Sequence, residues 1–596
     1  MVLPWLDDPV MLHSSRADTC KLTASQCEYR HGYWRYWYQA DHVYGHATIY
    51  FMCAVIGVFM ISNGVSKLPK RSKSNASFGC SLLQRGLATS RLLSYKSFHL
   101  RGLGWYSPPL GVILLGLCGV IYFFALTLAP KPYYWPNTKI VSFGGSPPLA
   151  TRAGWMALGL LPFVMLLSQK TNYITLLTGI SHEKLQVYHR WTSWAMFILA
   201  LIHTFPFIVV HIQKGDMMMQ WKMEVTYWTG VAALIPQAWL NIMSIGPIRN
   251  RYYEFFKATH YLAIGFFIFF FFIHCDFRLT SWDYFIAALS LYAFTLIVSF
   301  LRTSIQSLDL HALFATLPDG TLKITIPTKM KWKPGQHVFL RFWALGLNAY
   351  TSHPFTICSL PESGEMVFYM KPQAGFTRKL KKLVETQHGW MPMSVDGPYG
   401  DTDTASTLAR HDKALLIAGG SGVGYLLGVL EGVLKDAKKA VRDVKIIIAV
   451  RHSDSASWIL EAVESVLAEA KAGVKVELHI TDSAPSSPRL QAATSQPSSA
   501  SSLDIEKVAS KTASTPLAPI TSSHNGVKII QGMGRPDLRE LIRETTMEDG
   551  SVGVTACGPA SMMLAVTNSC ADAQSRILRG EAGARSVWLH TENFSW

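Results

Sequence analysis

The sequence predicts a bundle of about seven transmembrane α-helices, followed by a cytoplasmic part made of an antiparallel β-barrel and an α/β domain. Three observations predict this fold class. Apolar residues form 49% of the 596 residues, the mean hydropathy is +0.19, and the apolar excess lies before residue 302. Residues 305–405 alternate in short apolar strands. From residue 409 onward, strands and helices alternate around a glycine-rich turn, which is typical of a doubly wound sheet.

The apolar excess divides into segments of the length that crosses a bilayer. We expect a short extracytoplasmic N-terminus at 1–43 and a transmembrane domain at 44–302. The predicted spans are 46–64, 108–129, 153–168, 186–210, 226–245, 258–275 and 284–301, of which the third is the shortest.

Lysine and arginine predict the orientation of these spans. Segment 65–104 holds eight basic residues and no acidic residue, and such segments stay on the cytoplasmic side. The N-terminus is then outside, and everything after residue 302 is cytoplasmic. The net charge of +16 is explained by this topology signal and by attraction to anionic membrane lipid, so it indicates no nucleic-acid partner.

Two predicted spans each carry a pair of histidines fourteen residues apart, His189 with His203 and His260 with His274. Fourteen residues are nearly four helical turns, so each pair shares one helix face and is separated by about 21 Å. A single histidine in a membrane helix is as often a packing residue or a proton relay. The matched spacing instead predicts two stacked bis-histidine haem sites. The orientation assigns His189 and His260 to an inner haem and His203 and His274 to an outer one.

Residues 303–408 form the predicted β-barrel, with strands such as LKITIPTK, HVFLRFW and MVFYMK. Two short motifs lie inside it. They are His353, Pro354, Phe355 and Thr356, followed by Gly375, Phe376, Thr377 and Arg378.

Residues 409–596 form the predicted α/β domain, in which a glycine-rich turn follows the apolar strand ALLIA. The turn consists of Gly419, Gly420, Ser421, Gly422, Val423 and Gly424. Glycines let a backbone approach a pyrophosphate, and the N-terminus of the next helix favours the anion. Arg451 ends the following strand and suits a 2′-phosphate, which predicts NADPH rather than NADH.

Two further segments complete this domain. Cys557, Gly558 and Pro559 end a late strand at the same edge of the sheet and leave room for nicotinamide. Residues 483–525 are rich in Ser, Pro, Ala and Thr, and this composition predicts a disordered insert.

The joint order of these motifs resembles the fungal-type ferric-chelate reductases, within the ferric reductase and NADPH oxidase superfamily of transmembrane flavocytochromes b. The resemblance covers residues from about 30 to 596. It is carried by the two histidine pairs, HPFT at 353–356, GFTRKL at 375–380, DGPYG at 396–400, AGGSGVG at 418–424, CGP at 557–559 and the terminal ENFSW.

The resemblance implies a ferredoxin-reductase-like cytoplasmic module and a role for each motif. Residues 353–356 would line the flavin, and 375–378 would hold the FAD pyrophosphate. Residues 419–424 and 557–559 would contact NADPH. Phe594 and Trp596 would lie near the isoalloxazine and yield to nicotinamide. No catalytic group beyond these cofactor-binding residues is expected.

The implied activity is electron transfer from cytosolic NADPH through FAD and two b-type haems to an acceptor on the other side of the membrane. Ferric chelates or siderophores are the expected acceptors, with cupric ion as a further one, for iron and copper acquisition. A superoxide-producing NADPH oxidase is the alternative enzyme, and the additional spans and the terminal Trp596 favour the reductase. A redox-inactive receptor or channel is a third interpretation, against which the intact histidine and nucleotide motifs speak.

Some points stay open at this stage. The plasma membrane is the default location, with a vacuolar or other internal membrane as the alternative. His211 and Met217–Met219 lie near the expected outer haem, where they either bind metal or pack at the interface. The oligomeric state is not indicated.

Overall fold

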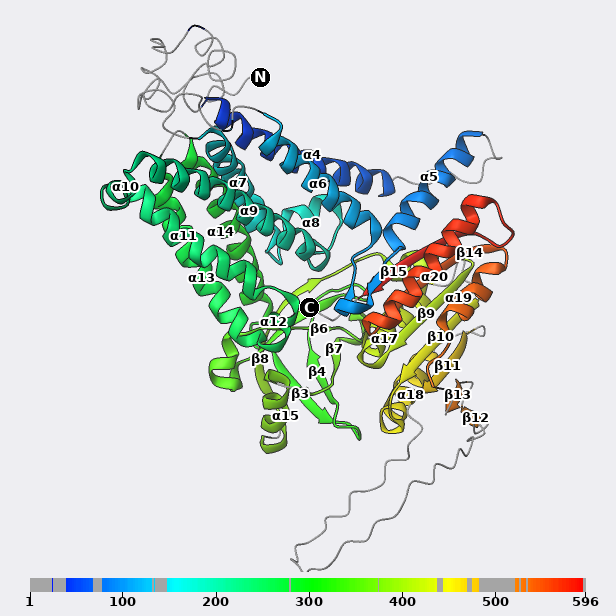
Figure 1. Cartoon of the computed structure of the whole chain (residues 1–596). Helices are drawn as coiled ribbons and strands as arrows, with labels where there is room; N and C mark the ends of the chain where they lie inside the picture. Colours follow the sequence, from blue (N-terminus) through cyan, green and yellow to red (C-terminus); the bar gives the residue numbers. More distant parts are fainter. Residues whose placement is uncertain are drawn as a thin grey trace, which may run out of the picture. The chain divides into compact units, whose positions relative to one another are not determined.

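The computed structural model divides into two compact units, residues 1–75 with 111–306 and residues 76–110 with 307–596 (Figure 1). The structure describes residues 24, 39–67, 78–130, 133, 147–277, 280–373, 375–387, 389–436, 443–468, 474–481, 520–524, 527–531 and 534–592.

The first unit is a helical bundle, and a helix lies at each of the seven predicted spans. These helices are α4 (Gln39–Lys67), α6 (Leu110–Leu128), α7 (Pro148–Leu167), α9 (His182–Lys214), α11 (Val225–Met243), α13 (Tyr253–Cys275) and α14 (Ser281–Gln306). The short helices α8 (Tyr173–Thr178), α10 (Met217–Met223) and α12 (Gly246–Arg251) connect them.

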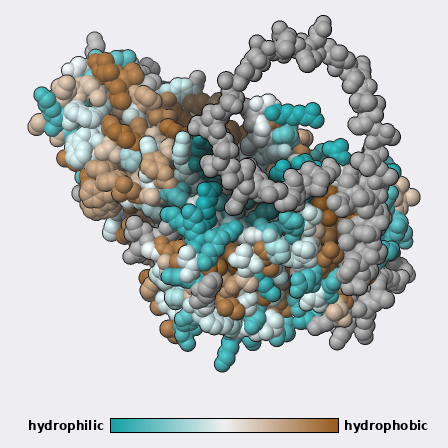
Figure 2. Space-filling view, turned by 90° about the horizontal axis from the view of Figure 1, so that it is seen from below, coloured by the Kyte–Doolittle hydropathy of each residue, from teal (hydrophilic) through white to brown (hydrophobic). Residues whose placement is uncertain are grey.

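Among the described residues, six of these helices are long and apolar enough to cross a membrane, and α11 is not one of the six. Large apolar side chains on their outer surfaces are exposed, as expected where lipid replaces water. Part of this surface is visible as brown patches in Figure 2. Examples are Val58, Ile61, Leu117, Val120, Phe124, Phe269 and Phe300.

Helix α7 lies at the centre of the bundle and is the most buried of the six spans. Small residues on α7 allow its neighbours to approach closely, as is common for membrane helices. A Cβ atom on Gly159 would lie 2.9 Å from the carbonyl oxygen of Gly45 on α4. A Cβ atom on Gly154 would lie 2.6 Å from the ring of His203 on α9. Helix α7 therefore holds α4 on one side and α9 on another.

The second unit begins with the predicted antiparallel barrel. Its strands are β3 (His311–Thr316), β4 (Leu322–Pro327), β5 (His337–Phe342), β6 (His353–Thr356), β7 (Glu365–Met370) and β8 (Met391–Tyr399), in the order β6-β5-β8-β3-β4-β7. Alternate residues such as Leu322, Ile324 and Ile326 on β4 are fully buried in the barrel core. Helix α15 (Phe376–Thr386) covers one end of this core with Phe376 and Leu380.

The α/β domain is a seven-stranded sheet in the order β12-β13-β11-β10-β9-β14-β15. The strands are β9 (Lys413–Gly419), β10 (Asp443–Val450), β11 (Val474–Ile480), β12 (Ile520–His524), β13 (Val527–Gln531), β14 (Gly550–Cys557) and β15 (Ala584–Glu592). All pairs are parallel except β12 with β13. Helices α17 (Val423–Asp436) and α18 (Ser453–Leu467) contribute to one hydrophobic core, and α19 (Leu538–Met547) and α20 (Ala560–Arg579) to another.

Strand β12 differs from the expectation for this region. Residues 520–524 fall inside the predicted disordered insert 483–525 but form an edge strand that pairs with β13. The rest of the insert up to residue 519 lies outside the described residues.

The barrel and the α/β domain pack against each other within this unit. Ser455 Oγ donates a hydrogen bond to Asp319 Oδ2 over 2.8 Å, and the rings of Tyr369 and Trp458 stack at 4.6 Å. His590 Nδ1 lies 3.1 Å from Asp401 Oδ2. Burial raises the pKa of Asp401, but the hydrogen bond and charge of His590 outweigh it and hold that pKa well below its usual range.

Helix α5 (Phe78–Tyr95) was not predicted, because segment 65–104 was assigned to a loop between two spans. It packs in the second unit, on α20 and β15. The backbone N–H of Leu589 donates to Tyr95 Oη over 3.0 Å, and Arg91 donates to Ser586 Oγ over 2.9 Å. Tyr95 belongs to the core under α20, and burial raises its pKa to about 12, so the phenol stays protonated.

We predict that Tyr95→Ala loosens the α/β domain in the full-length protein. Removing a buried aromatic side chain typically costs about 3 kcal/mol, and here it also leaves the N–H of Leu589 without its partner. The measurement is hydrogen–deuterium exchange of α20 and β15, which should become faster. Lys96→Ala is the control, because the exposed ion pair of Lys96 with Asp572 is worth less than about 1 kcal/mol. Equal effects of the two variants would contradict the packing described here.

Candidate cofactor sites

The outer pair of predicted haem ligands is brought together inside the bundle. The rings of His203 on α9 and His274 on α13 are 5.7 Å apart between centroids, at an interplanar angle of 83°. A metal ion bonded to one nitrogen of each ring at about 2 Å spans a separation of this size. The separation of these two imidazoles therefore fits a metal ion held between them.

Both imidazoles of this pair are oriented by backbone carbonyls of neighbouring helices. His203 Nδ1 lies 2.8 Å from the carbonyl oxygen of Ala150 on α7, and His274 Nδ1 lies 2.6 Å from that of Thr226 on α11. In the tautomer that forms these bonds, Nδ1 donates and Nε2 carries the lone pair. This is how metal-ligating histidines are commonly held.

The inner pair repeats this support on α9. His189 Nδ1 lies 3.0 Å from the carbonyl oxygen of Val164, also on α7. Val164 and Ala150 are fourteen residues apart, like His189 and His203, because α7 and α9 are neighbouring antiparallel helices. His260, its predicted partner, lies on α13, the helix that also carries His274. Within the described part of the chain, His260 Nδ1 is buried and has no hydrogen-bond partner.

Two glycines make room for the outer imidazoles. A Cβ atom on Gly154 would lie 2.6 Å from His203 Nδ1, and one on Gly230 would lie 2.8 Å from His274 Nδ1. Any larger residue at either place would displace the ring. The sequence analysis missed both glycines, although glycine in a membrane helix commonly marks a close approach. Neutral imidazoles held in such cradles fit the axial ligands of a haem.

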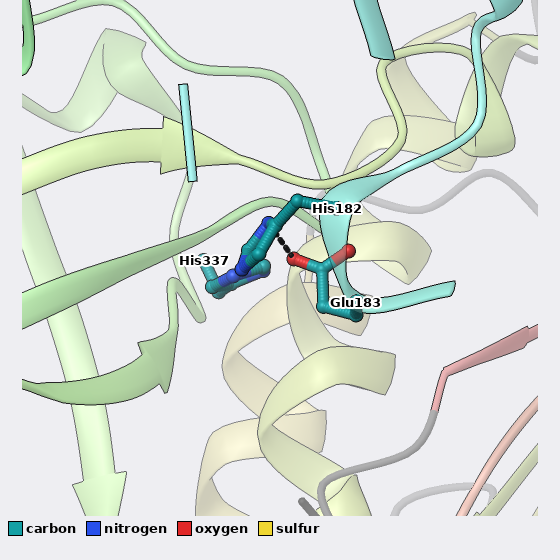
Figure 3. Close-up of side chains that lie close together, drawn as sticks. All are labelled: His182, Glu183 and His337. Atoms are coloured by element: carbon teal, nitrogen blue, oxygen red, sulfur yellow. Dashed lines mark ion pairs between the residues drawn. The ribbon is translucent and has the colours of Figure 1, made fainter. Parts of the chain in front are cut away.

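A further histidine pairs with a carboxylate at the start of α9 (Figure 3). His182 Nδ1 lies 2.8 Å from Glu183 Oε1, and both side chains are largely buried. The sequence contains no motif that predicted this pair.

In the barrel, the two predicted flavin motifs meet. The ring of His353 on β6 stacks on that of Phe376 at 4.0 Å with an interplanar angle of 21°. Gly375 adopts φ +62° just before α15, a conformation that glycine takes without strain. Thr377 Oγ1 accepts from the N–H of Gln373, and Arg378 Nε donates to its carbonyl. The N-terminus of α15 and Arg378 together form a positive end that suits a pyrophosphate.

The nucleotide motifs of the α/β domain also meet, at the carboxyl edge of the sheet. Strands β9 and β14 are parallel neighbours, so the turns that follow them lie side by side. A Cβ atom on Gly422 would lie 2.2 Å from the carbonyl oxygen of Cys557. On β10, Ala449 is in register with Gly419, which places Arg451 beyond the same edge. This arrangement is the one by which open α/β sheets bind dinucleotides.

The first turns of α17 connect this edge to the flavin motif of the barrel. A Cβ atom on Gly424 would lie 2.9 Å from Cys358 Sγ, and one on Gly428 would lie 2.9 Å from the carbonyl oxygen of Ile357. Residues 357 and 358 directly follow the HPFT motif. The dinucleotide turn and the predicted flavin strand are therefore adjacent, as hydride transfer between two bound cofactors requires.

The cysteines at this junction are not suited to nucleophilic chemistry. Burial raises the pKa of Cys358 to about 12 and that of Cys557 well above its usual value. Both stay neutral thiols at physiological pH, and a thiol is a poor nucleophile. Phe594 and Trp596, predicted to lie near the flavin, are outside the described residues.

Comparisons with known proteins agree with this division of the chain. Residues 153–271 match the ferric reductase like transmembrane component, 309–403 match an FAD-binding domain, and 411–571 match the ferric reductase NAD binding domain. These matches cover His189, His203 and His260, the HPFT and GFTR motifs, and the glycine-rich turn, and His274 lies three residues beyond the first match.

Similar proteins come from fungi. A probable cell surface ferric reductase of Aspergillus oryzae is 33% identical over 59% of this chain and 50% of its own length. The ferric/cupric reductase transmembrane component 7 of Saccharomyces cerevisiae is 27% identical over 70% of this chain and 69% of its own length. The chain thus spans between half and about two thirds of the length of these relatives. With a ferric reductase like transmembrane component, an FAD-binding domain and a ferric reductase NAD binding domain in one order, the chain has the domain composition of a ferric reductase.

Proposed function

We propose that this protein is an NADPH-dependent ferric-chelate reductase, which carries electrons across a membrane to ferric chelates or siderophores and to cupric ion. The observation that carries the proposal is the presence of two histidine pairs along α9 and α13. Backbone carbonyls of α7 and α11 hold Nδ1 of His189, His203 and His274. Two haem irons at these places would divide the span of the bilayer into short electron-transfer distances. Four histidines, His189 with His260 and His203 with His274, are the proposed ligands.

The chemistry of the bound groups determines what the residues must do. FAD, when bound, converts the hydride of NADPH into single electrons, which is the form a haem iron accepts. The protein's part is to position these groups. In this proposal, His353–Thr356 and Gly375–Arg378 hold the flavin, Gly419–Gly424 and Cys557–Pro559 hold the dinucleotide, and Arg451 pairs with a 2′-phosphate.

Helix α5 supports the proposed cytosolic position of the nucleotide-binding unit. The segment that joins α4 to α6 packs in the same unit as residues 307–596, so both lie on one side of the membrane. From α6 to α14 the chain contains α6, α7, α9, α11, α13 and α14, and an even number of crossings returns it to that side. The basic residues of 65–104 then assign this side to the cytosol. This count also requires α11 to cross, although it is less apolar than the others.

The relatives support the proposed substrates and location. One is named as a cell surface ferric reductase and another as a ferric/cupric reductase. We therefore place the protein in the plasma membrane, with electrons leaving on the outer side. An internal membrane would keep the same topology with the acceptor in the lumen.

The decisive assay supplies NADPH and a ferric chelate to membranes that contain the protein and follows ferrous iron with a colorimetric trap. We expect the same rate with superoxide dismutase and without oxygen. A rate that collapses under either condition would identify oxygen as the acceptor and make the protein an oxidase.

The histidine variant His203→Ala should retain reduction of bound flavin by NADPH while losing metal reduction.

We predict that Gly154→Ala removes the outer haem and leaves the inner one. The added Cβ atom would occupy the place of the His203 ring, whose Nδ1 is bonded to the carbonyl oxygen of Ala150, one turn earlier on the same helix as Gly154. The measurement is haem per protein and the reduced-minus-oxidised absorbance of the purified variant, which should show about half the haem. Gly265→Ala on α13 is the matched control, because a Cβ there meets nothing within 4 Å. Full haem content in Gly154→Ala would contradict the assigned cradle.

We predict that Arg451→Ala lowers the preference for NADPH over NADH. Loss of a charged partner to the 2′-phosphate should raise KM for NADPH roughly tenfold or more, and KM for NADH should stay near its starting value. Steady-state rates with both cofactors measure this. Arg579→Ala is the control, because Arg579 ends α20 at the opposite edge of the sheet and pairs with Glu581. An equal rise in both KM values would rule out a role in 2′-phosphate recognition.

A further inference from the structure

Helix α4 carries a third pair of histidines, which the proposed haem sites do not use. His42 and His46 are one helical turn apart, and their side chains are buried, with 8% and 2% exposed. Their ring centroids are 4.2 Å apart, at an interplanar angle of 76°. Burying two imidazoles in an apolar bundle costs free energy unless they have polar partners or bind an ion.

Hydroxyl groups at the start of α14 surround this pair. Thr280 Oγ1 lies 2.6 Å from His42 Nε2. Tyr284 is 3% exposed, and its Oη lies 2.9 Å from the place of a Cβ atom on Gly45, between the two histidines. Among the residues that the structure describes, Tyr284 Oη and Ser281 Oγ are buried and have no hydrogen-bond partner. The buried, unpartnered hydroxyl of Tyr284 beside the histidine pair indicates a site for a bound ion.

Helix α7 links this cluster to the outer haem ligands. Gly154 faces the ring of His203, and the ring of the next residue, Trp155, is 4.9 Å from that of His42. His42 and His203 therefore lie at the same level of α7, on different sides of it. A helix with its side chains is about 10 Å across, so the two sites are separated by a distance of that order.

The charges near the cluster are compatible with a bound cation. Asp283 lies in the first turn of α14, beside Tyr284. The nearest buried cation on α7, Arg152, is directed at the ring of Tyr44 and donates to the carbonyl oxygens of Pro130 and Pro148.

We propose that His42 and His46, with the hydroxyls of Thr280 and Tyr284, bind a bare Cu²⁺ ion, which is the acceptor of electrons from NADPH on the side of the membrane where His203 and His274 lie. Imidazole nitrogen suits Cu²⁺, which binds nitrogen sites more tightly than the other divalent first-row metals. The burial of both rings excludes a bulky ferric chelate. Each NADPH reduces two ions in turn, giving NADP⁺, one proton and two Cu⁺, and no covalent bond to the protein is made.

The inference rests on the proposed function but is first tested without it. Purified full-length protein in its oxidised form is titrated with Cu²⁺ and followed by electron paramagnetic resonance, with no NADPH present. We expect one bound ion with nitrogen hyperfine structure. The double variant H42A/H46A should bind copper at least tenfold more weakly, with its haem content unchanged. The control His311→Ala, at an exposed histidine of the barrel, should bind as the wild type does.

A second arm measures reduction with NADPH. H42A/H46A should raise KM for Cu²⁺ about tenfold or more and leave the rate with ferric citrate unchanged. If the double variant does not assemble with haem, His42→Asn keeps a polar group beside Thr280 and removes one ligand, and the same losses are expected in smaller measure.

Three results would decide against parts of this picture. Unchanged copper affinity in the variants would overturn the site. Lost copper binding with unchanged Cu²⁺ reduction would overturn its role as the acceptor. Copper binding by the wild type, with no metal reduced under any condition, would overturn the proposed function and leave the binding site standing.

Discussion

The hydrogen bonds between histidine Nδ1 atoms and backbone carbonyls of other helices are the constraint on which the bundle depends. A carbonyl within a helix already accepts one bond, and its second lone pair is available only to a group that comes very close. This is why Gly154 and Gly230 lie where α7 and α11 meet the rings of His203 and His274. The position of α7 between α4 and α9 follows from the same requirement.

The sequence predicted the fold and the main motifs because both have short-range signals. Apolar length marked all seven helices of the bundle, and a fourteen-residue repeat marked His189, His203, His260 and His274. The glycine turn and Cys557–Pro559 lie together because β9 and β14 are parallel neighbours. HPFT meets GFTR in the antiparallel barrel, where the ring of His353 stacks on that of Phe376. The assignment of individual residues to FAD, NADPH and haem stays a prediction.

The features that were not predicted from the sequence depend on contacts between residues far apart in the chain. Helix α5 lies in a basic segment. It is stabilised by the burial of Tyr95 under α20, and Leu589, which donates to the Tyr95 hydroxyl, lies nearly five hundred residues later in the chain. His42 and His46 have the ordinary spacing of one helical turn, so only the hydroxyls of α14 distinguish them from packing residues. Edge strand β12 was not predicted for a similar reason. Its polar composition resembles that of the neighbouring insert, and it forms a strand because it pairs with β13.

The docking of α5 has a consequence for biosynthesis. Arg91 and its partner Val587 are 496 residues apart in the chain. At about 5–20 residues per second, the ribosome needs roughly 25–100 s to make the partner after α5 has emerged. During that time all the later spans must enter the membrane, while α5 has no partner on which to pack. A basic helix with apolar residues can bind the anionic lipid surface. Such binding would keep the nascent helix from aggregating until β15 has been synthesised.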